Sequence, residues 1–352
     1  MRSILIKNGR IWNGNDFFCG DIFIDGGRVV KIADSIDCDA FFTYDANGNT
    51  VSAGFVDIHT HMKGISPDIY GICIDAVCLP FGVTTAADAG ASMGDDSLLD
   101  SFAVDSFAYA FAEIKNNSVL TDSLDKRINA YGKRLAGLKI SFDTTGGEIY
   151  DINPLREACE ISRRLGLPLT VHTSSSPVSM LEIVKELKRG DILTHSFHGG
   201  ANTSVEDDCA SLRLAREKGV VIDAGLAGYV HTDFGVFAKA VESGYSPDVI
   251  STDITCASAF MRGGRYGMTM CMSVAREVGM SEENIFRAVT STPARVLGAE
   301  AGRLFEGCVA DLCVIGVGES FSLTDKEGNT VQSDNGYKCL LTVKNGQILY
   351  RY

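Results

Sequence analysis

The stretch Val51-Ser-Ala-Gly-Phe-Val-Asp-Ile-His-Thr-His61 joins a short apolar run to a His-Thr-His element. The apolar run predicts a buried β-strand. Alternate residues of a strand point to the same side, so His59 and His61 would face one space together. Two imidazoles in that arrangement can chelate one cation. This stretch therefore predicts a metal-binding strand end.

The same arrangement recurs further along the chain. One histidine closes Leu167-Pro-Leu-Thr-Val-His172, and another closes Asp191-Ile-Leu-Thr-His195. A carboxylate takes the equivalent position in Val249-Ile-Ser-Thr-Asp253. Ligand-type side chains at the ends of several buried strands are typical of a hydrolytic metal centre.

The middle of the chain alternates strand-like and helix-like segments, including helices expected near 122–131 and 154–164. Strands alternating with helices over residues 52–301 predict an α/β fold of the (β/α)₈ TIM-barrel type. Functional residues of such barrels lie at the carboxyl ends of the strands. The expected strands end near His61, Ala89, Glu113, Ser141, His172, Ser196, Ala224 and Thr255.

The two ends of the chain have a different predicted secondary structure, with short β segments and Asn-Gly or Asp-Gly-Gly turns. Neither end is long enough to bury a core alone. We therefore expect residues 1–51 and 302–352 to pair into one small β-sandwich beside a barrel formed by 52–301.

Lys139 lies inside the apolar segment Leu135-Ala-Gly-Leu-Lys-Ile-Ser141, on the expected fourth strand. A charged ammonium is costly to bury, so this lysine should be paired, deprotonated or modified. A neutral amine near two cations could take up carbon dioxide and become a carbamate that bridges them. The alternative is a lysine that extends along the barrel rim to solvent.

The charge, the length of apolar runs and the cysteine content limit the kinds of partner and location that are expected. The formal net charge of −13 argues against nucleic acid as a partner. The sequence contains no run of about 18 or more apolar residues, so no membrane-spanning segment is expected. Eleven cysteines without a Cys-x-x-Cys pair are typical of reduced thiols, which favours a cytoplasmic location. The expected partner is a small-molecule substrate, and a homo-oligomer is left open.

Taken together, these residues resemble the binuclear branch of the amidohydrolase superfamily. The strand-one stretch is similar to that superfamily's signature, and Gly302-Arg-Leu-Phe-Glu-Gly-Cys-Val-Ala-Asp-Leu-Cys-Val314 is similar to its return into the terminal sandwich. Gly137-Leu-Lys139, Thr194-His-Ser-Phe-His-Gly199 and Ser251-Thr-Asp-Ile254 look closest to the dihydroorotase-like, or deacetylase-like, group.

The resemblance implies two divalent ions, for which zinc suits the ligands, and a carbamate made from carbon dioxide on Lys139. Asp253 would be both a ligand and the catalytic general base and acid for attack by a metal-bridging hydroxide. The expected reaction is hydrolysis of an amide or ester bond in a small, anionic acylated compound. The implied metal ligands are His59, His61, Lys139, His172, His195 and Asp253.

Other functions stay open at this point. A cyclic amidohydrolase of the dihydroorotase type would use the same centre. A deaminase of this fold needs a separate glutamate near strand five, and no glutamate follows His172 before Glu182, which disfavours it. A non-catalytic relative has no reason to keep all the ligands.

The chain departs from the related group after the seventh strand, where Leu226 stands at the position of a usual histidine. His231 follows five residues later and could reach the same space as a substrate contact. His198 could contact substrate or only support the loop. Arg262 and Arg265 could clamp a substrate carboxylate or lie in solvent.

Overall fold

Seven parallel strands form the sheet that carries the predicted ligands. The computed structural model describes residues 2–64, 70–90, 96–227, 230–261 and 265–352. The sheet order is β14-β13-β12-β11-β8-β7-β6, and each strand is parallel to its neighbour. The strands are β6 (Phe55–Thr60), β7 (Val83–Asp88), β8 (Asp105–Ala112), β11 (Leu135–Ser141), β12 (Leu169–His172), β13 (Ile192–Thr194) and β14 (Val221–Ile222).

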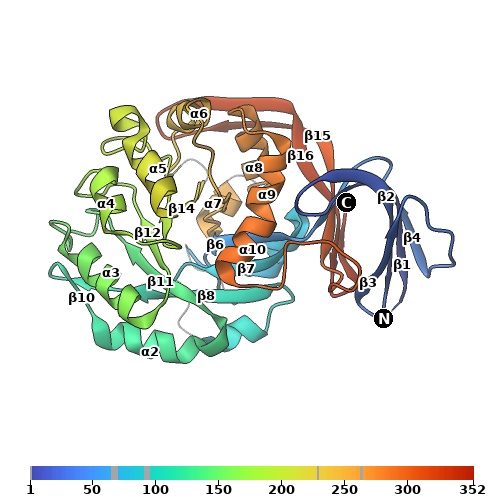
Figure 1. Ribbon diagram of the computed structural model, residues 1–352, viewed down its shortest axis with the longest axis horizontal. Coiled ribbons are helices and arrows are strands. Elements are labelled where there is room, and N and C mark those ends of the chain that lie inside the picture. The colour runs from blue at the N-terminus through green and yellow to red at the C-terminus, as the bar shows by residue number, and fades with distance from the viewer. Residues whose placement is uncertain (1, 65–69, 91–95, 228–229, 262–264) are drawn as a thin grey trace.

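Helices follow most of these strands and cover the outer side of the curled sheet (Figure 1). The predicted helices at 122–131 and 154–164 are confirmed as α2 and α3, with ends that differ by one residue. The helices are α1 (Ile74–Cys78), α2 (Thr121–Tyr131), α3 (Asn153–Leu165), α4 (Met180–Glu186), α5 (Glu206–Lys218), α6 (Phe234–Glu242), α7 (Cys256–Met261), α8 (Met268–Glu277), α9 (Glu282–Val289) and α10 (Ser291–Leu297). A small hairpin, β9 (Ile114–Lys115) and β10 (Ser118–Val119), precedes α2.

The segment 249–254 takes the place of the predicted eighth strand. It makes isolated parallel bridges at both edges of the sheet, from Val249 to Asp223 and from Ile254 to Thr60. The curled α/β sheet is therefore established, while a closed eight-stranded barrel stays a prediction. These bridges hold 249–254 between the ends of β14 and β6.

Both chain ends contribute to a second sheet with its own core. Its order is β17-β16-β15-β5-β1-β2-β3, with β4 paired to β1. Isoleucine, valine and leucine side chains from residues 4–53 and 304–348 pack together there. The pairing of the ends is as predicted, whereas a two-layered sandwich and the domain boundaries stay predictions. The strands are β1 (Ile4–Trp12), β2 (Phe17–Asp25), β3 (Arg28–Ala33), β4 (Phe42–Asp45), β5 (Thr50–Ala53), β15 (Leu312–Thr324), β16 (Thr330–Lys344) and β17 (Gln347–Arg351).

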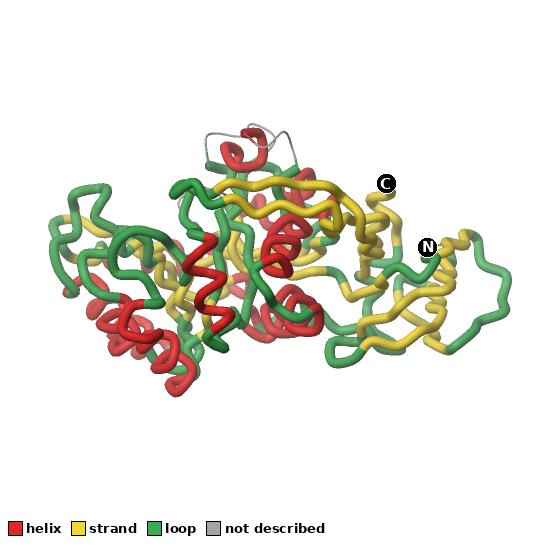
Figure 2. The backbone as a smooth tube through the Cα atoms, turned by 90° about the horizontal axis from the view of Figure 1, so that it is seen from above, coloured by secondary structure: helices red, strands yellow, loops and turns green. Residues whose placement is uncertain are grey.

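The β15–β16 hairpin extends beyond the small sheet and crosses the helical layer (Figures 1 and 2). Tyr337 N donates to Ser273 Oγ of α8 at 2.8 Å. At the hairpin tip, Asp325 Oδ2 accepts from Phe234 N, the first residue of α6, at 2.8 Å. The hairpin thus ties the carboxyl-terminal segment to the loop that precedes α6. Within the described ranges, the helices are all too short or too polar to cross a membrane.

Candidate metal centre

The predicted ligands come together at the carboxyl ends of the sheet strands. Five of the six line one cavity of about 500 Å³. The sixth, His195, has its ring centroid 4.5 Å from that of His172. The five that line the cavity are His59, His61, Lys139, His172 and Asp253. The arrangement expected from the spacing of strands is therefore present in three dimensions.

The first group joins both histidines of the His-Thr-His element to Asp253. The Oδ1 atom of Asp253 lies 2.9 Å from His61 Nε2 and 3.1 Å from His59 Nε2. The backbone holds this contact, because Asp253 N donates to His59 O at 2.8 Å and His61 N donates to Ile254 O at 3.1 Å. Asp57 adds a side-chain link, since its carboxylate accepts from Thr252 Oγ1 at 2.6 Å.

Hydrogen bonds on the far sides of both rings fix where their protons lie. His61 Nδ1 faces Gly90 O at 3.1 Å, and a carbonyl can only accept, so this nitrogen carries the proton. His59 Nδ1 faces Thr194 Oγ1 at 3.0 Å, and Thr194 gives its own proton to Asp223 Oδ2 at 2.6 Å. Each Nε2 of a neutral ring therefore presents a lone pair to the Asp253 carboxylate.

Lone pairs facing a carboxylate repel unless a proton or a cation lies between them. Burial and Lys139 lower the pKa of His59, but Asp253 and Asp223 raise it more, so the net shift is upward. The pKa of Asp253 lies well below its ordinary value, because the nearby histidines outweigh the opposite effect of burial. This group is thus arranged for positive charge, and its donor set fits a divalent cation.

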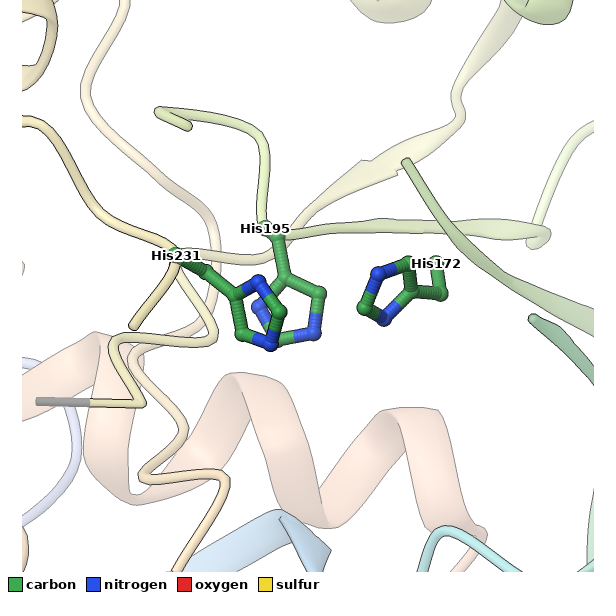
Figure 3. A group of neighbouring side chains, drawn as sticks. All are labelled: His172, His195 and His231. Carbon is green, nitrogen blue, oxygen red and sulfur yellow. The ribbon is translucent and has the colours of Figure 1, made fainter. Parts of the chain in front are cut away.

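The second group consists of His172, His195 and His231, whose ligand nitrogens lie within 4.8 Å of one another. Figure 3 shows the three rings gathered at one place on three different segments of the chain. The ring centroids of His195 and His231 are 4.2 Å apart, and those of His172 and His231 are 4.8 Å apart. Burial holds the pKa of His172 and of His195 well below the usual range, so both are neutral and can bind a cation.

Two of the ligands adopt the left-handed backbone region that side chains other than glycine rarely enter. His195 has φ of 58° and Asp253 has φ of 49°. Such conformations persist where the surrounding structure imposes them, often at functional sites. Gly225 approaches His195 closely, since a Cβ added at Gly225 would lie 2.8 Å from His195 Nδ1. The carbonyl of Gly225 accepts from this nitrogen at 2.6 Å, which leaves His195 Nε2 buried without a partner among the described residues.

Lys139 is enclosed at the same centre and does not extend to solvent. The side chain is 3% exposed, and Nζ lies 3.4 Å from His59 Nε2. Burial lowers the pKa of Lys139 to about 8, against the opposing effect of Asp253 and Asp223. A neutral amine is therefore much more accessible here than on a surface lysine.

The substrate contacts expected from the sequence are not all at this cavity. His231 lines it, but His198 is fully buried and directs Nδ1 to Gly199 O at 3.0 Å. Arg265 lines a separate cavity beside α8 and the β15–β16 hairpin, together with Phe81 and Tyr337. Arg262 lies outside the described residues. The carboxylate clamp proposed for Arg265 therefore finds no support in its position.

Residues that sequence reasoning did not single out complete the centre. Ser174 Oγ lies 2.7 Å from His172 Nε2 and 2.8 Å from His231 Nδ1. Its spacing of two from His172 was the available signal, because this spacing places two side chains on one strand face. Asp223, directly after β14, is fully buried and receives hydrogen bonds from Thr194 and Ser251. The available signal was Asp223-Ala-Gly225, which keeps the Asp-x-Gly part of the related group's strand-seven pattern.

Comparison with known proteins agrees with this geometry. The model of the amidohydrolase family matches residues 50–349, and the chain therefore belongs to that family. A deacetylase of Enterococcus faecalis is 29% identical, with 98% of each chain covered. A deacetylase of Agrobacterium fabrum is 27% identical over 88% of this chain and 81% of its own length. The resemblance stated from the sequence is thus confirmed.

Solved structures support the same fold. A crystal structure of an adenine deaminase superposes with a TM-score of 0.86 and 28% identity, and both chains are covered completely. A crystal structure of a dihydroorotase gives a TM-score of 0.85 at 22% identity, with 100% of this chain and 98% of that chain covered. The second match concerns the fold alone.

Proposed function

We propose that this member of the amidohydrolase family hydrolyses an amide or ester bond of a small acylated compound, with two divalent cations bound at the centre. The observation that carries the proposal is the pair of adjacent ligand groups with Asp253 between them. Asp253 contacts the first group through Oδ1, and its Oδ2 lies 3.9 Å from His195 Nε2 and 3.8 Å from His231 Nε2 of the second.

His59, His61 and Asp253 would hold one cation, and His172 with His195 would hold the other. When bound, such cations polarise a substrate carbonyl and lower the pKa of water from 15.7 to about 7. Lys139 lies beside the first group. Its neutral amine would form an N–C bond with carbon dioxide and release one proton, which gives an anionic carbamate able to bind both cations.

Asp253 is placed to move the proton of the reaction. It is ionised in the resting site and faces both histidine groups. The carboxylate takes a proton from the attacking water while the water oxygen bonds to the substrate carbonyl carbon. The same proton then passes to the leaving nitrogen or oxygen as the C–N or C–O bond breaks.

The relatives and the cavity together favour acyl hydrolysis over deamination. Both named deacetylases match most of the chain. Glu182, the nearest glutamate after His172, instead forms a capping box with Ser179 at the start of α4. Among the described residues that line the cavity, the acids are Asp143 and Asp253, so a separate glutamate acid is missing there.

The cavity lining also bears on substrate choice. Its described part carries hydroxyl groups from Ser141, Thr145 and Ser258 and apolar surface from Phe111 and Val230, without an arginine. A preference for anionic substrates would therefore have to come from the bound cations. We propose a small acyl group held against this apolar surface, with the hydroxyls orienting the leaving group.

Metal analysis and a substrate panel test this function. We expect protein purified without chelator to contain about two divalent ions per chain, since two imidazole-rich ligand groups are present. Dialysis against a chelator should abolish activity, and zinc with bicarbonate should restore it. A stoichiometry of one after this treatment would contradict the two-cation proposal.

The panel should contain N-acetyl amino acids, O-acetyl hydroxy acids, dihydroorotate and adenine. Turnover of the acetylated compounds alone would support the proposal. Turnover of adenine with release of ammonia, in the absence of acyl hydrolysis, would replace it with a deaminase.

A further inference from the structure

We propose that His231 is a third imidazole ligand of the cation bound by His172 and His195. The inference rests on the proposed two-cation centre and adds a ligand that the family pattern does not supply. His231 comes from the loop after β14, five residues beyond the buried Leu226. The loop brings into the centre an imidazole that is not in the expected ligand set.

Ser174 is placed to accept a hydrogen bond from one nitrogen of each of two rings, His172 and His231. Its hydroxyl oxygen has two lone pairs, and it lies within hydrogen-bond distance of His172 Nε2 and His231 Nδ1. If both nitrogens donate to Ser174, the remaining nitrogens, His172 Nδ1 and His231 Nε2, carry lone pairs. The described residues provide no hydrogen-bond partner for either of them.

All three rings then share one arrangement. Each has its outward nitrogen bonded to an oxygen, which is Ser174 Oγ for two rings and Gly225 O for His195. In that tautomer each ring has its other nitrogen available as a ligand, and one ligand nitrogen of each ring lies within 4.8 Å of the others. Metal-binding histidines characteristically donate their second ring N–H to an oxygen in this way.

His231 and His195 also occupy equivalent positions relative to the first ligand group. Their Nε2 atoms lie 3.8 and 3.9 Å from the same atom, Asp253 Oδ2. The ligand nitrogens of the two rings and of His172 also lie within 4.8 Å of one another. The mutual spacing and the shared contact with Asp253 together point to one ion position.

Hydrogen bonds to neighbouring segments hold residues 231–234. Gly199 N donates to His231 O at 3.4 Å, Asp233 N donates to Phe197 O at 2.9 Å, and Thr232 Oγ1 donates to Leu226 O at 2.9 Å. The tip of the β15–β16 hairpin adds the Asp325 contact to Phe234 N. Because these bonds fix the backbone, little conformational entropy is lost when His231 binds a cation.

The decisive experiment compares metal binding by the parent, His231→Asn and His198→Asn. His198 is a matched control, since its backbone pairs with Thr232 of the same loop but its ring lies outside the centre. Zinc affinity is measured by competition with a chromophoric chelator, and cobalt-loaded protein is examined by visible absorption. Neither measurement depends on activity.

We expect His231→Asn to keep one ion at parental affinity and to bind the second at least about 10- to 100-fold more weakly, the range known for lost supporting contacts of metal ligands. The cobalt absorption should change as one nitrogen ligand is lost. His198→Asn should retain both ions and the parental spectrum. Ser174→Ala, which removes the oxygen shared by His172 and His231, should weaken the same ion while leaving the other unchanged.

Two results would overturn the inference, and they differ from failure of the proposed function. If His231→Asn binds both ions with parental affinity and spectrum but has a raised KM, His231 is a substrate contact. If His198→Asn weakens the second ion equally, the loop and not the imidazole is responsible. Failure of the proposed function would already be seen in the parent, as a single bound ion.

Discussion

Replacing Asp253 with asparagine is expected to lower kcat by about 10²- to 10⁴-fold, the usual contribution of a general acid–base group. Asparagine keeps the size of the side chain and can still contact the histidines. It cannot take up a proton as the carboxylate between the two ligand groups can. The effect should therefore appear mainly in turnover, in protein that remains folded.

Metal content must be measured beside the rate, because Asp253 also contacts His59 and His61. Asp143→Asn is the matched control. Asp143 lines the same cavity, but its carboxylate accepts from Ser141 Oγ and Thr145 N and is not in contact with the histidines. We expect Asp143→Asn to stay within a few-fold of the parent. A folded, metal-loaded Asp253→Asn variant with a similar rate would eliminate Asp253 as the base.

The grouping of the expected ligands on regular strands could be predicted because strand geometry has a short period. His59 and His61 share a face for that reason, and His172 follows the same pattern at the end of β12. Lys139 drew attention because a lysine buried in an apolar strand is costly unless it is paired, deprotonated or modified. For these residues the local sequence pattern predicts on which strand, and on which side of it, the side chain lies.

The loop residues could not be placed in this way. His231 reaches the centre because its loop pairs with Phe197 and Gly199 and is held by Asp325, which lies about ninety residues further along the chain. Arg265 and His231 both follow a sheet segment in the sequence, yet only His231 lines the cavity with the ligands. These outcomes depend on contacts between distant segments, for which the sequence carries no periodic signal.

The eighth strand illustrates a second limit. Val249-Ile-Ser-Thr-Asp253 has the composition of the other strands, but its residues make only isolated bridges. The left-handed φ of Asp253 interrupts the extended backbone at the point where its carboxylate must meet the histidines. The sequence pattern predicts the strand but carries no sign of the left-handed residue that ends it.

Lys139→Ala should have the other large effect, the loss of measurable activity together with metal affinity weakened by about 10²-fold or more. With a pKa of about 8, roughly a tenth of the Lys139 amine is neutral at pH 7, compared with less than about a thousandth for an ordinary lysine at 10.5. Only the neutral form can bond to carbon dioxide.

Lys139→Met separates the carbamate from simple packing, because methionine fills most of the same volume without an amine. Both variants should lose the bridging anion, but only Lys139→Ala leaves a space beside His59 that a short carboxylic acid can occupy. We therefore expect acetate or propionate to restore part of the activity and metal content to Lys139→Ala and none to Lys139→Met.

Parent protein equilibrated with ¹³C-bicarbonate should show a carbamate carbon signal that Lys139→Met lacks. A Lys139→Met variant that keeps both ions and the parental rate would show that the lysine is not a ligand, and the two cations would then have to be held by histidine and Asp253 alone.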